Sequence, residues 1–417
     1  MRVTLVRALP GIVRANNKGT ELLLLSNALC DTQHGGARSS RRDSRREKTV
    51  QGSNKINDMQ VSRRSFLGLF GATAATLGLG LAGCGSDEGK GGAATAPASD
   101  AKELDKLVMV WLPNESASEF DAGREEFGKV LEKYAGVPVE LMTTTDYNVA
   151  IEAISSGKAQ LANMGAEGFI QAQKKNDKVL PLVTTADPDG KLDGAKYYSR
   201  LCVPADQMDQ YKDADDPTGY SIKNIKGKRM SFVTPTSTSG FKVPSNAIMK
   251  AFPDDVKSTD ELSKPGFFSE VLFGNSHPGS AVNLLQGDAD VAAFDDVDTD
   301  TYLAVPEGDR DAVNGAGSIY QVKDGAEQPF DRVQGKSFGI IQSTPVLNGP
   351  IAVNTAVVPQ DIIDKLVKGL TSEETSKDEL LFAPEDAEGT GAVWSRGDTA
   401  GFIEVENDWY DPIRELA

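Results

Sequence analysis

Between residues 104 and 340 the sequence runs twice through the same alternation of strand-like and helix-like segments, which restricts the folds open to it. The first run predicts strands and helices in the order strand 106–113, helix 119–136, strand 137–144, helix 146–159 and strand 159–165. In helix 119–136 the large apolar residues recur on one stripe, and Gly136 follows as a stop signal. Strands that alternate with helices are typical of a parallel sheet covered by its connecting helices.

The second run predicts a second lobe of the same kind. Its segments are strand 223–233, helix 241–252, strand 270–275, helix 277–288 and strand 289–296. The two lobes are expected to join around residues 197–204, and the apolar segment 338–343 is expected to return the chain to the first lobe. We therefore expect an α/β protein of two lobes: 104–203 as the first part of lobe 1, 204–340 as lobe 2, and 341–417 as the return to lobe 1 with C-terminal helices.

Residues 59–83 have the composition of an export signal, with Arg63 and Arg64 before an apolar run rich in Leu, Gly and Ala. The "SRRSFL" segment resembles a twin-arginine signal, and "LAGC" resembles the lipobox of bacterial lipoproteins, which predicts lipidation of Cys84. The alternative is a transmembrane anchor, but the run is short and glycine-rich. Residues 84–103 are predicted to be a flexible tether, and 1–58 a non-native or disordered leader with Met59 as the true start.

Charge and cysteine content exclude several classes of function. Residues 1–83 hold 13 of the 44 basic and 5 of the 61 acidic side chains, so the remainder would carry a formal net charge of −25. A surface so acidic repels nucleic acid and anionic lipid, so attachment to a membrane would depend on the lipid alone. With Cys84 lipidated, only Cys202 would remain beyond the signal, which leaves no disulfide within one chain.

The stretch "TPTSTSG" (residues 234–240, the hydroxyl loop) places five hydroxyl groups between a predicted strand and a predicted helix. Pro244 is tolerated only in the first turn of a helix, so the helix is expected to begin near Gly240 or Phe241. Hydroxyls just upstream would then join free N–H groups at the positive end of the helix, an arrangement that favours an anion. The alternative is plain N-capping, which needs a single Ser or Thr.

Other polar groups are expected at the same edge. In open α/β sheets, ligands lie beyond the carboxyl ends of the strands, where "LPNES", "TTTDY", "GNSH" and "FDD" are also predicted to fall. His277 begins a predicted helix there and could donate to the same anion, although a lone histidine is more often a surface or capping residue. The chain has only two histidines, which makes a metal site improbable. No cofactor is predicted.

Taken together, "TPTSTSGFKVP" and "NSHPGSAVNLLQGDADVAAFDD" resemble the phosphate, phosphite and phosphonate substrate-binding proteins of ABC transporters. The resemblance extends from about residue 104 to 373 and agrees with the lipoprotein start. It implies the class II fold of periplasmic binding proteins, with mixed sheets flanked by helices and a ligand in the cleft between two lobes.

The resemblance also implies a set of ligand-binding residues. Acidic residues hold the amine of aminoalkylphosphonates in some relatives, but here they match out of register, and Gly349 replaces an expected acid, so recognition of an amino group stays open. Glu167 departs from the small or polar residues of the family, and its alternative reading is a solvated loop acid. The implied residues are Ser237, Thr238, Ser239, His277, Tyr147, Tyr197, Ser116, Asp295 and Asp296.

The sequence therefore predicts a lipid-anchored, exported monomer that captures a small phosphorus oxyanion by hinge closure and delivers it to an ABC permease and ATPase. Two alternatives remain. One keeps the fold with another ligand, such as a sulfonate, carboxylate or vitamin precursor. The other is a serine hydrolase built on Ser237, His277 and Asp295, although no G-x-S-x-G elbow is present.

Overall fold

The computed structural model describes residues 104–116, 120–384, 387 and 391–416. The expectations for the leader, the export signal, Cys84 and the tether concern residues 1–103 and lie outside this range. Within the described residues, none of the helices has the length and apolar character needed to span a membrane.

The first lobe contains a six-stranded mixed sheet with the order β15-β4-β12-β3-β1-β2. In it β1 is parallel to both neighbours, whereas β12 runs antiparallel to β3 and β4. Its strands are β1 (Leu107–Trp111), β2 (Val139–Thr143), β3 (Leu161–Asn163), β4 (Val179–Thr185), β12 (Pro350–Asn354) and β15 (Phe402–Glu404).

The second lobe contains a seven-stranded mixed sheet with the order β7-β6-β8-β5-β11-β10-β9. Here β6 is parallel to β7 and β8, and β5 is antiparallel to β8 and β11. Its strands are β5 (Lys196–Pro204), β6 (Arg229–Phe232), β7 (Glu270–Phe273), β8 (Val291–Asp295), β9 (Leu303–Ala304), β10 (Ile319–Val322) and β11 (Ser337–Leu347).

The two sheets share one arrangement, since in each a parallel trio is flanked by an antiparallel strand that comes from elsewhere in the chain. The prediction of two lobes with mixed sheets flanked by helices is thus confirmed. The boundary at residue 203 needs correction, because β5 already belongs to the second sheet from Lys196. It pairs with β11 along nearly its full length, from Lys196–Leu347 to Pro204–Phe338, and this buried ladder holds both crossing strands in lobe 2.

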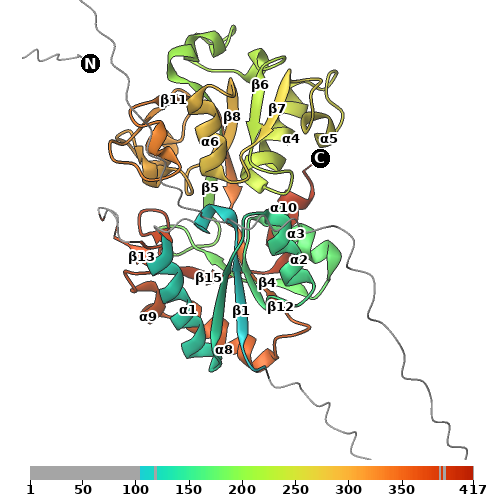
Figure 1. Cartoon of the computed structure of the whole chain (residues 1–417), viewed down its shortest axis with the longest axis vertical. Helices are drawn as coiled ribbons and strands as arrows, with labels where there is room; N and C mark the ends of the chain where they lie inside the picture. Colours follow the sequence, from blue (N-terminus) through green and yellow to red (C-terminus); the bar gives the residue numbers. More distant parts are fainter. Residues whose placement is uncertain (1–103, 117–119, 385–386, 388–390, 417) are drawn as a thin grey trace, which may run out of the picture. The chain divides into compact units, whose positions relative to one another are not determined.

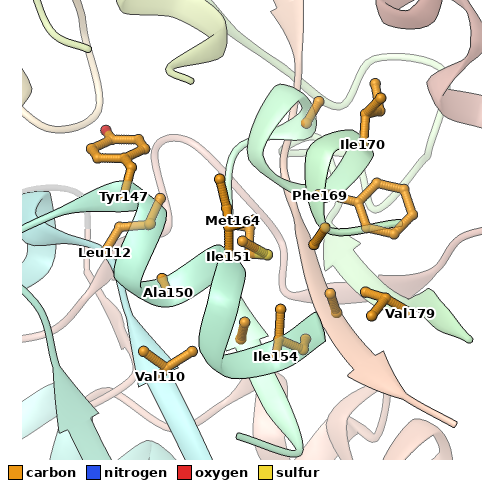
Figure 2. Close-up of a cluster of buried hydrophobic side chains, with 14 of the residues drawn as sticks. Val110, Leu112, Tyr147, Ala150, Ile151, Ile154, Met164, Phe169, Ile170 and Val179 are labelled. Atoms are coloured by element: carbon orange, nitrogen blue, oxygen red, sulfur yellow. The ribbon is translucent and has the colours of Figure 1, made fainter. Parts of the chain in front are cut away.

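Helices cover both faces of the first sheet (Figure 1). On one face, α1 (Asp121–Ala135) and α8 (Gln360–Leu370) bury apolar side chains against β1, β3, β4 and β12. On the other face lie α2 (Tyr147–Ser155) and α3 (Ala166–Lys175), whose core is drawn in Figure 2. There Ile151 and Ile154 of α2 point toward Met164 and Val110, so this helix is fixed over the sheet with Tyr147 at its first turn.

The second sheet is covered in the same way by α4 (Val243–Ala251) and α6 (His277–Gln286), which belong to two separate buried apolar clusters. The remaining elements are short. They are η1 (Pro113–Ser116), η3 (Ala205–Tyr211), η4 (Ile222–Asn224), η5 (Thr238–Lys242), α5 (Thr259–Leu262), η6 (Asp300–Tyr302), α7 (Arg310–Val313), η7 (Phe330–Arg332), α9 (Glu373–Ser376), β13 (Phe382–Ala383), β14 (Trp394–Ser395), η8 (Asn407–Tyr410) and α10 (Asp411–Arg414).

Candidate binding site

A cavity of about 140 Å³ is lined by residues of both lobes, at the ends of the strands where the sequence predicted polar groups to converge. Its volume is below the several hundred Å³ typical of sites for drug-sized ligands, which indicates a small ligand. Of the residues predicted for the site, those that line the cavity are Tyr147, Tyr197, Ser237, Thr238, Ser239, His277 and Asp295.

The hydroxyl loop forms the first turn of a helix. Residues Thr238–Lys242 make a π-helical turn that continues directly into α4, and Ser237 caps it by accepting a hydrogen bond from Gly240 N at 3.1 Å. Within the described part of the chain, no acceptor is found for the N–H groups of Thr238 and Ser239. These N–H groups and the buried hydroxyls therefore form a concentration of donors at the positive end of a helix.

The expectation that the helix starts near Gly240 or Phe241 is wrong by two to three residues. Pro244 is the second residue of α4, but the preceding π turn extends the helix upstream to Thr238. In that pattern the carbonyl of Ser239 would accept from residue 244, which has no N–H. Ser199 Oγ donates to this carbonyl instead, at 2.6 Å, so the proline is accommodated without an unsatisfied acceptor.

His277 lies at the start of α6 with its ring buried against the hydroxyl loop. The backbone N–H of Asp295 donates to Nδ1 at 3.0 Å, so the neutral ring carries its proton on Nε2. Nε2 lies 3.3 Å from Ser237 Oγ and 3.4 Å from Ser239 Oγ. Burial lowers the pKa of His277 to about 3, so the imidazole is neutral near pH 7 and serves as a single N–H donor.

Asp295, at the end of β8, brings a buried carboxyl group into the same cluster. Ser239 Oγ donates to its Oδ2 at 3.1 Å and the N–H of Asp298 donates to Oδ1 at 3.1 Å. Burial, reinforced by the charge of Asp296, raises the pKa of Asp295 well above its usual value. His277 Nε2 also lies 3.3 Å from Asp295 Oδ2, so the ring and the carboxyl group share one polar pocket.

Lobe 1 contributes fewer polar groups, and two of them contact lobe 2. Tyr147 donates to Asn114 Oδ1 at 3.0 Å, and the N–H of His277 donates to the same oxygen at 3.3 Å. The N–H of Glu167 donates to Thr238 Oγ1 at 2.9 Å. Burial raises the pKa of Tyr197, which keeps that phenol protonated as a further donor.

Three predicted positions need separate mention. Asp296 is buried but does not line the cavity, because its carboxylate accepts from Tyr198 N at 2.8 Å and from Arg310 at 3.1 Å. The backbone of Ser116 lies in η1, next to the cavity-lining Asn114. Glu167 is not a solvated loop acid, since it is buried in the first turn of α3 and accepts from Gln171.

Several lining residues were not predicted from the sequence. Asn114 lies two positions before the predicted Ser116, in the same loop after β1. Thr184 and Thr185 end β4, a strand that runs parallel to β3 and so could have been found by the rule that selected the other strand ends. The further unpredicted residues are Asn163, Gly165, Asn348, Asp298, Trp394 and Phe402.

The lining contains two carboxylates and no Lys or Arg among the described residues. His277, Asp295 and Asp298 each offer one atom within 4.8 Å of the others, a spacing at which a metal ion could be held. However, the amide N–H on Nδ1 leaves the ring proton on Nε2, the nitrogen that faces the carboxylates. The ring therefore presents a donor to the cavity rather than a lone pair for a metal.

Two α/β lobes of matching strand order, with one small polar cavity lined by both, define the class of two-lobe periplasmic binding proteins. Residues 109–410 match the model of the family described as "ABC transporter, phosphonate, periplasmic substrate-binding protein", and the chain belongs to this family. The resemblance inferred from the hydroxyl loop and the His277 segment is thereby confirmed.

The relatives agree with this assignment. The phosphate-import protein PhnD of Mycolicibacterium smegmatis is 28% identical over 190 residues, which cover 45% of this chain and 55% of the relative, so the match spans about half the length of that curated protein. A solved binding-protein component of a phosphonate ABC transporter from Pseudomonas aeruginosa has a TM-score of 0.51 at 18% identity, covering 75% of this chain and 86% of its own. The PhnD1 protein of Prochlorococcus marinus, solved in complex with methylphosphonate, has a TM-score of 0.52 at 15% identity, covering 75% and 97%. At these identities the two structures support the fold.

Proposed function

We propose that this chain is the substrate-binding component of an ABC importer and that it binds a small phosphorus oxyanion in the cavity between its lobes. The observation that carries the proposal is the cluster at the start of α4, where the free N–H groups of Thr238 and Ser239 lie beside three buried hydroxyls and the Nε2–H of His277. These groups are all donors, as an oxyanion requires.

The names of the relatives support this ligand class. One is a phosphate-import protein and another was solved with methylphosphonate. The small cavity volume fits phosphate, phosphite or a short alkylphosphonate better than a vitamin precursor. Ser237, Thr238, Ser239 and His277 would bind the oxygens, and Tyr147 and Tyr197 would donate from the opposite wall.

Binding would act by hinge closure. The contacts of Asn114 with His277 and of Thr238 with Glu167 join the lobes beside the cavity. A ligand that touches both lobes favours the arrangement in which these contacts form, so binding shifts the population toward it. The closed protein would then deliver its ligand to the permease and ATPase subunits, as a monomer on the outer face of the cytoplasmic membrane or in the periplasm, held by a lipid on Cys84.

The geometry gives less support to the serine hydrolase. A catalytic triad needs the carboxylate on the histidine nitrogen opposite the nucleophile. Here Asp295 Oδ2 lies 3.3 Å from Nε2, the same nitrogen that faces Ser237 and Ser239, while Nδ1 is occupied by a backbone N–H. The family's relatives are transport proteins rather than enzymes.

A thermal-shift panel tests the proposed ligand class. The protein is heated with phosphate, phosphite, methylphosphonate, 2-aminoethylphosphonate or sulfate, each at the same concentration. We expect at least one phosphorus oxyanion to raise the melting temperature by several degrees, because a ligand that binds only the folded state stabilises it. If sulfate or a carboxylate gives the largest shift, the ligand class is wrong.

A further inference from the structure

Two carboxyl groups line the same cavity as the proposed anion-binding donors. Asp295 is 2% exposed, and Asp298 lies nearby with its Oδ2 at 4.0 Å from His277 Nε2. Among the lining residues described, no Lys or Arg offsets their charge. A phosphorus dianion beside two ionised carboxylates would be repelled, so the site needs a further positive charge or a proton.

A proton fits the surroundings of Asp295 better than a cation does. The Nε2 of His277 carries a hydrogen and so offers no lone pair to a metal. Each oxygen of the Asp295 carboxyl group receives one hydrogen bond, from Ser239 or from the N–H of Asp298, and each retains a second lone pair. Ser239, which donates to this carboxyl group, belongs to the turn proposed to hold the oxyanion. The carboxyl group therefore lies within one residue's reach of the ligand's expected position.

We propose that one proton is held between the Asp295 carboxyl group and an oxygen of the bound oxyanion, so that the ligand is taken up together with one proton. This inference rests on the proposed function and specifies its ligand class. Phosphate, phosphite and alkylphosphonates accept a proton near neutral pH, whereas sulfate does not. The site would thus select oxyanions that can carry a hydroxyl group, and Asp295 would be its specificity-determining residue.

The groups around Asp295 leave few other sources for a proton taken up between pH 6 and 9. His277 stays neutral and the buried tyrosines stay protonated over this range. Asp298 is the other cavity acid and therefore needs its own control. The titratable or charged groups that face Asp295 are His277 on α6, Tyr197 and Arg200 on β5, and Asp296 and Asp298 after β8.

Calorimetric titration with methylphosphonate tests the proposal. Titrations at pH 8.5 in two buffers of different ionisation enthalpy give the number of protons taken up. We expect nearly one for the wild-type protein, with affinity falling by up to about tenfold per pH unit above pH 8. Asp295→Asn removes the shared proton, so its uptake should fall to near zero and its affinity should become flat with pH. Asp298→Asn should retain the wild-type uptake.

The outcomes separate this inference from the proposed function. If the wild-type protein binds methylphosphonate without taking up a proton, or if Asp295→Asn takes up as many as the wild type, this inference alone is wrong. It is also wrong if binding is lost in EDTA and restored by a divalent cation. If the wild type binds none of methylphosphonate, phosphite and phosphate, the proposed function itself fails. The wild-type uptake decides the question even where Asp295→Asn does not fold.

Discussion

The two lobes share a strand order but present different chemistry at equivalent strand ends. In lobe 2, the loops after β6 and β8 and the start of α6 supply hydroxyls, free N–H groups, an imidazole and a carboxyl group. In lobe 1, the loops after β1 and β3 supply Asn114 and Gly165, and β4 ends in two threonines. Topology therefore fixes where a ligand can lie, while the loop residues decide what it is.

The difference suggests a division of labour between the lobes. The polar groups of lobe 2 are held by contacts within that lobe, such as Ser199 with the Ser239 carbonyl and Asp295 N with His277. The polar contacts of Asn114 and of the N-terminus of α3 extend across to lobe 2 instead. Changes in lobe 2 should therefore alter ligand affinity and folding together, and changes in lobe 1 should mainly alter closure.

The largest effect is expected for Gly240→Ala in lobe 2. An added Cβ would lie 2.2 Å from Val233 Cγ2 and 2.4 Å from its Cβ, so the π turn would have to move. Overpacking of this kind typically costs about 1–3 kcal/mol of unfolding free energy. We expect a lower urea midpoint and a loss of methylphosphonate affinity of roughly 100-fold or more, the equivalent of one or two donors to a charged group. A variant with unchanged affinity would mean that the turn does not hold the ligand.

His277→Gln should come next, because it removes a buried donor to the anion. Hydrogen bonds to charged groups contribute about 1.5–3 kcal/mol, so affinity should fall roughly 10- to 100-fold. The variant should also change the pH dependence of stability. Since burial lowers the pKa of His277 to about 3, the unfolded chain takes up a proton below pH 6.5 that the folded chain does not, and stability is lost as pH falls toward 3.

The raised pKa of Asp295 acts in the opposite sense, adding stability as pH falls. The informative quantity is therefore the difference in unfolding free energy between wild type and His277→Gln at pH 7 and at pH 5. We expect the advantage of the wild type to shrink by up to about 1.4 kcal/mol per pH unit below 6.5. A difference that is constant with pH would contradict a neutral, buried His277.

Gly165→Ala is the lobe 1 counterpart of Gly240→Ala. Its Cβ would lie 2.9 Å from Thr238 Oγ1, a side chain of the other lobe, so the clash exists only when the lobes meet. We expect a urea midpoint close to wild type and an affinity about tenfold lower, by analogy with other modest overpacking. A large loss of stability would show that the residue supports lobe 1 itself, and the proposed division between lobes would fail.

The sequence predicted the lobes and the second-lobe motifs well, because strand and helix periods and the hydroxyl loop are local signals. It placed the start of the helix too late because Pro244 marks a first turn only where the helix is purely α, and the π turn depends on Ser199 from a distant strand. Asp296 was included with Asp295, although adjacent residues at a strand end point to opposite faces of the sheet. Asn114 was missed because its partner His277 is 163 residues away.

The smallest effect is expected for Asp398→Ala. Asp398, before β15, lies 3.4 Å from Nε of Arg310 in α7, so this pair joins the lobes away from the cavity. Its side chain is 42% exposed, and exposed ion pairs contribute about 0–1 kcal/mol, so affinity should fall by no more than about fivefold. A loss as large as that of His277→Gln would assign closure to this pair instead of to the cavity.

The central claim is that the start of α4 binds a phosphorus oxyanion, and calorimetric titration of the wild type and the Ser237→Ala/Thr238→Ala double variant with methylphosphonate, phosphite and phosphate tests it most directly. Thr236→Ala, a change in the same loop outside the cavity lining, is the matched control. We predict micromolar or tighter binding of at least one of these anions by the wild type and the control, and no measurable binding by the double variant. Equal affinity in all three proteins, or no heat with any of the three anions, would contradict the account.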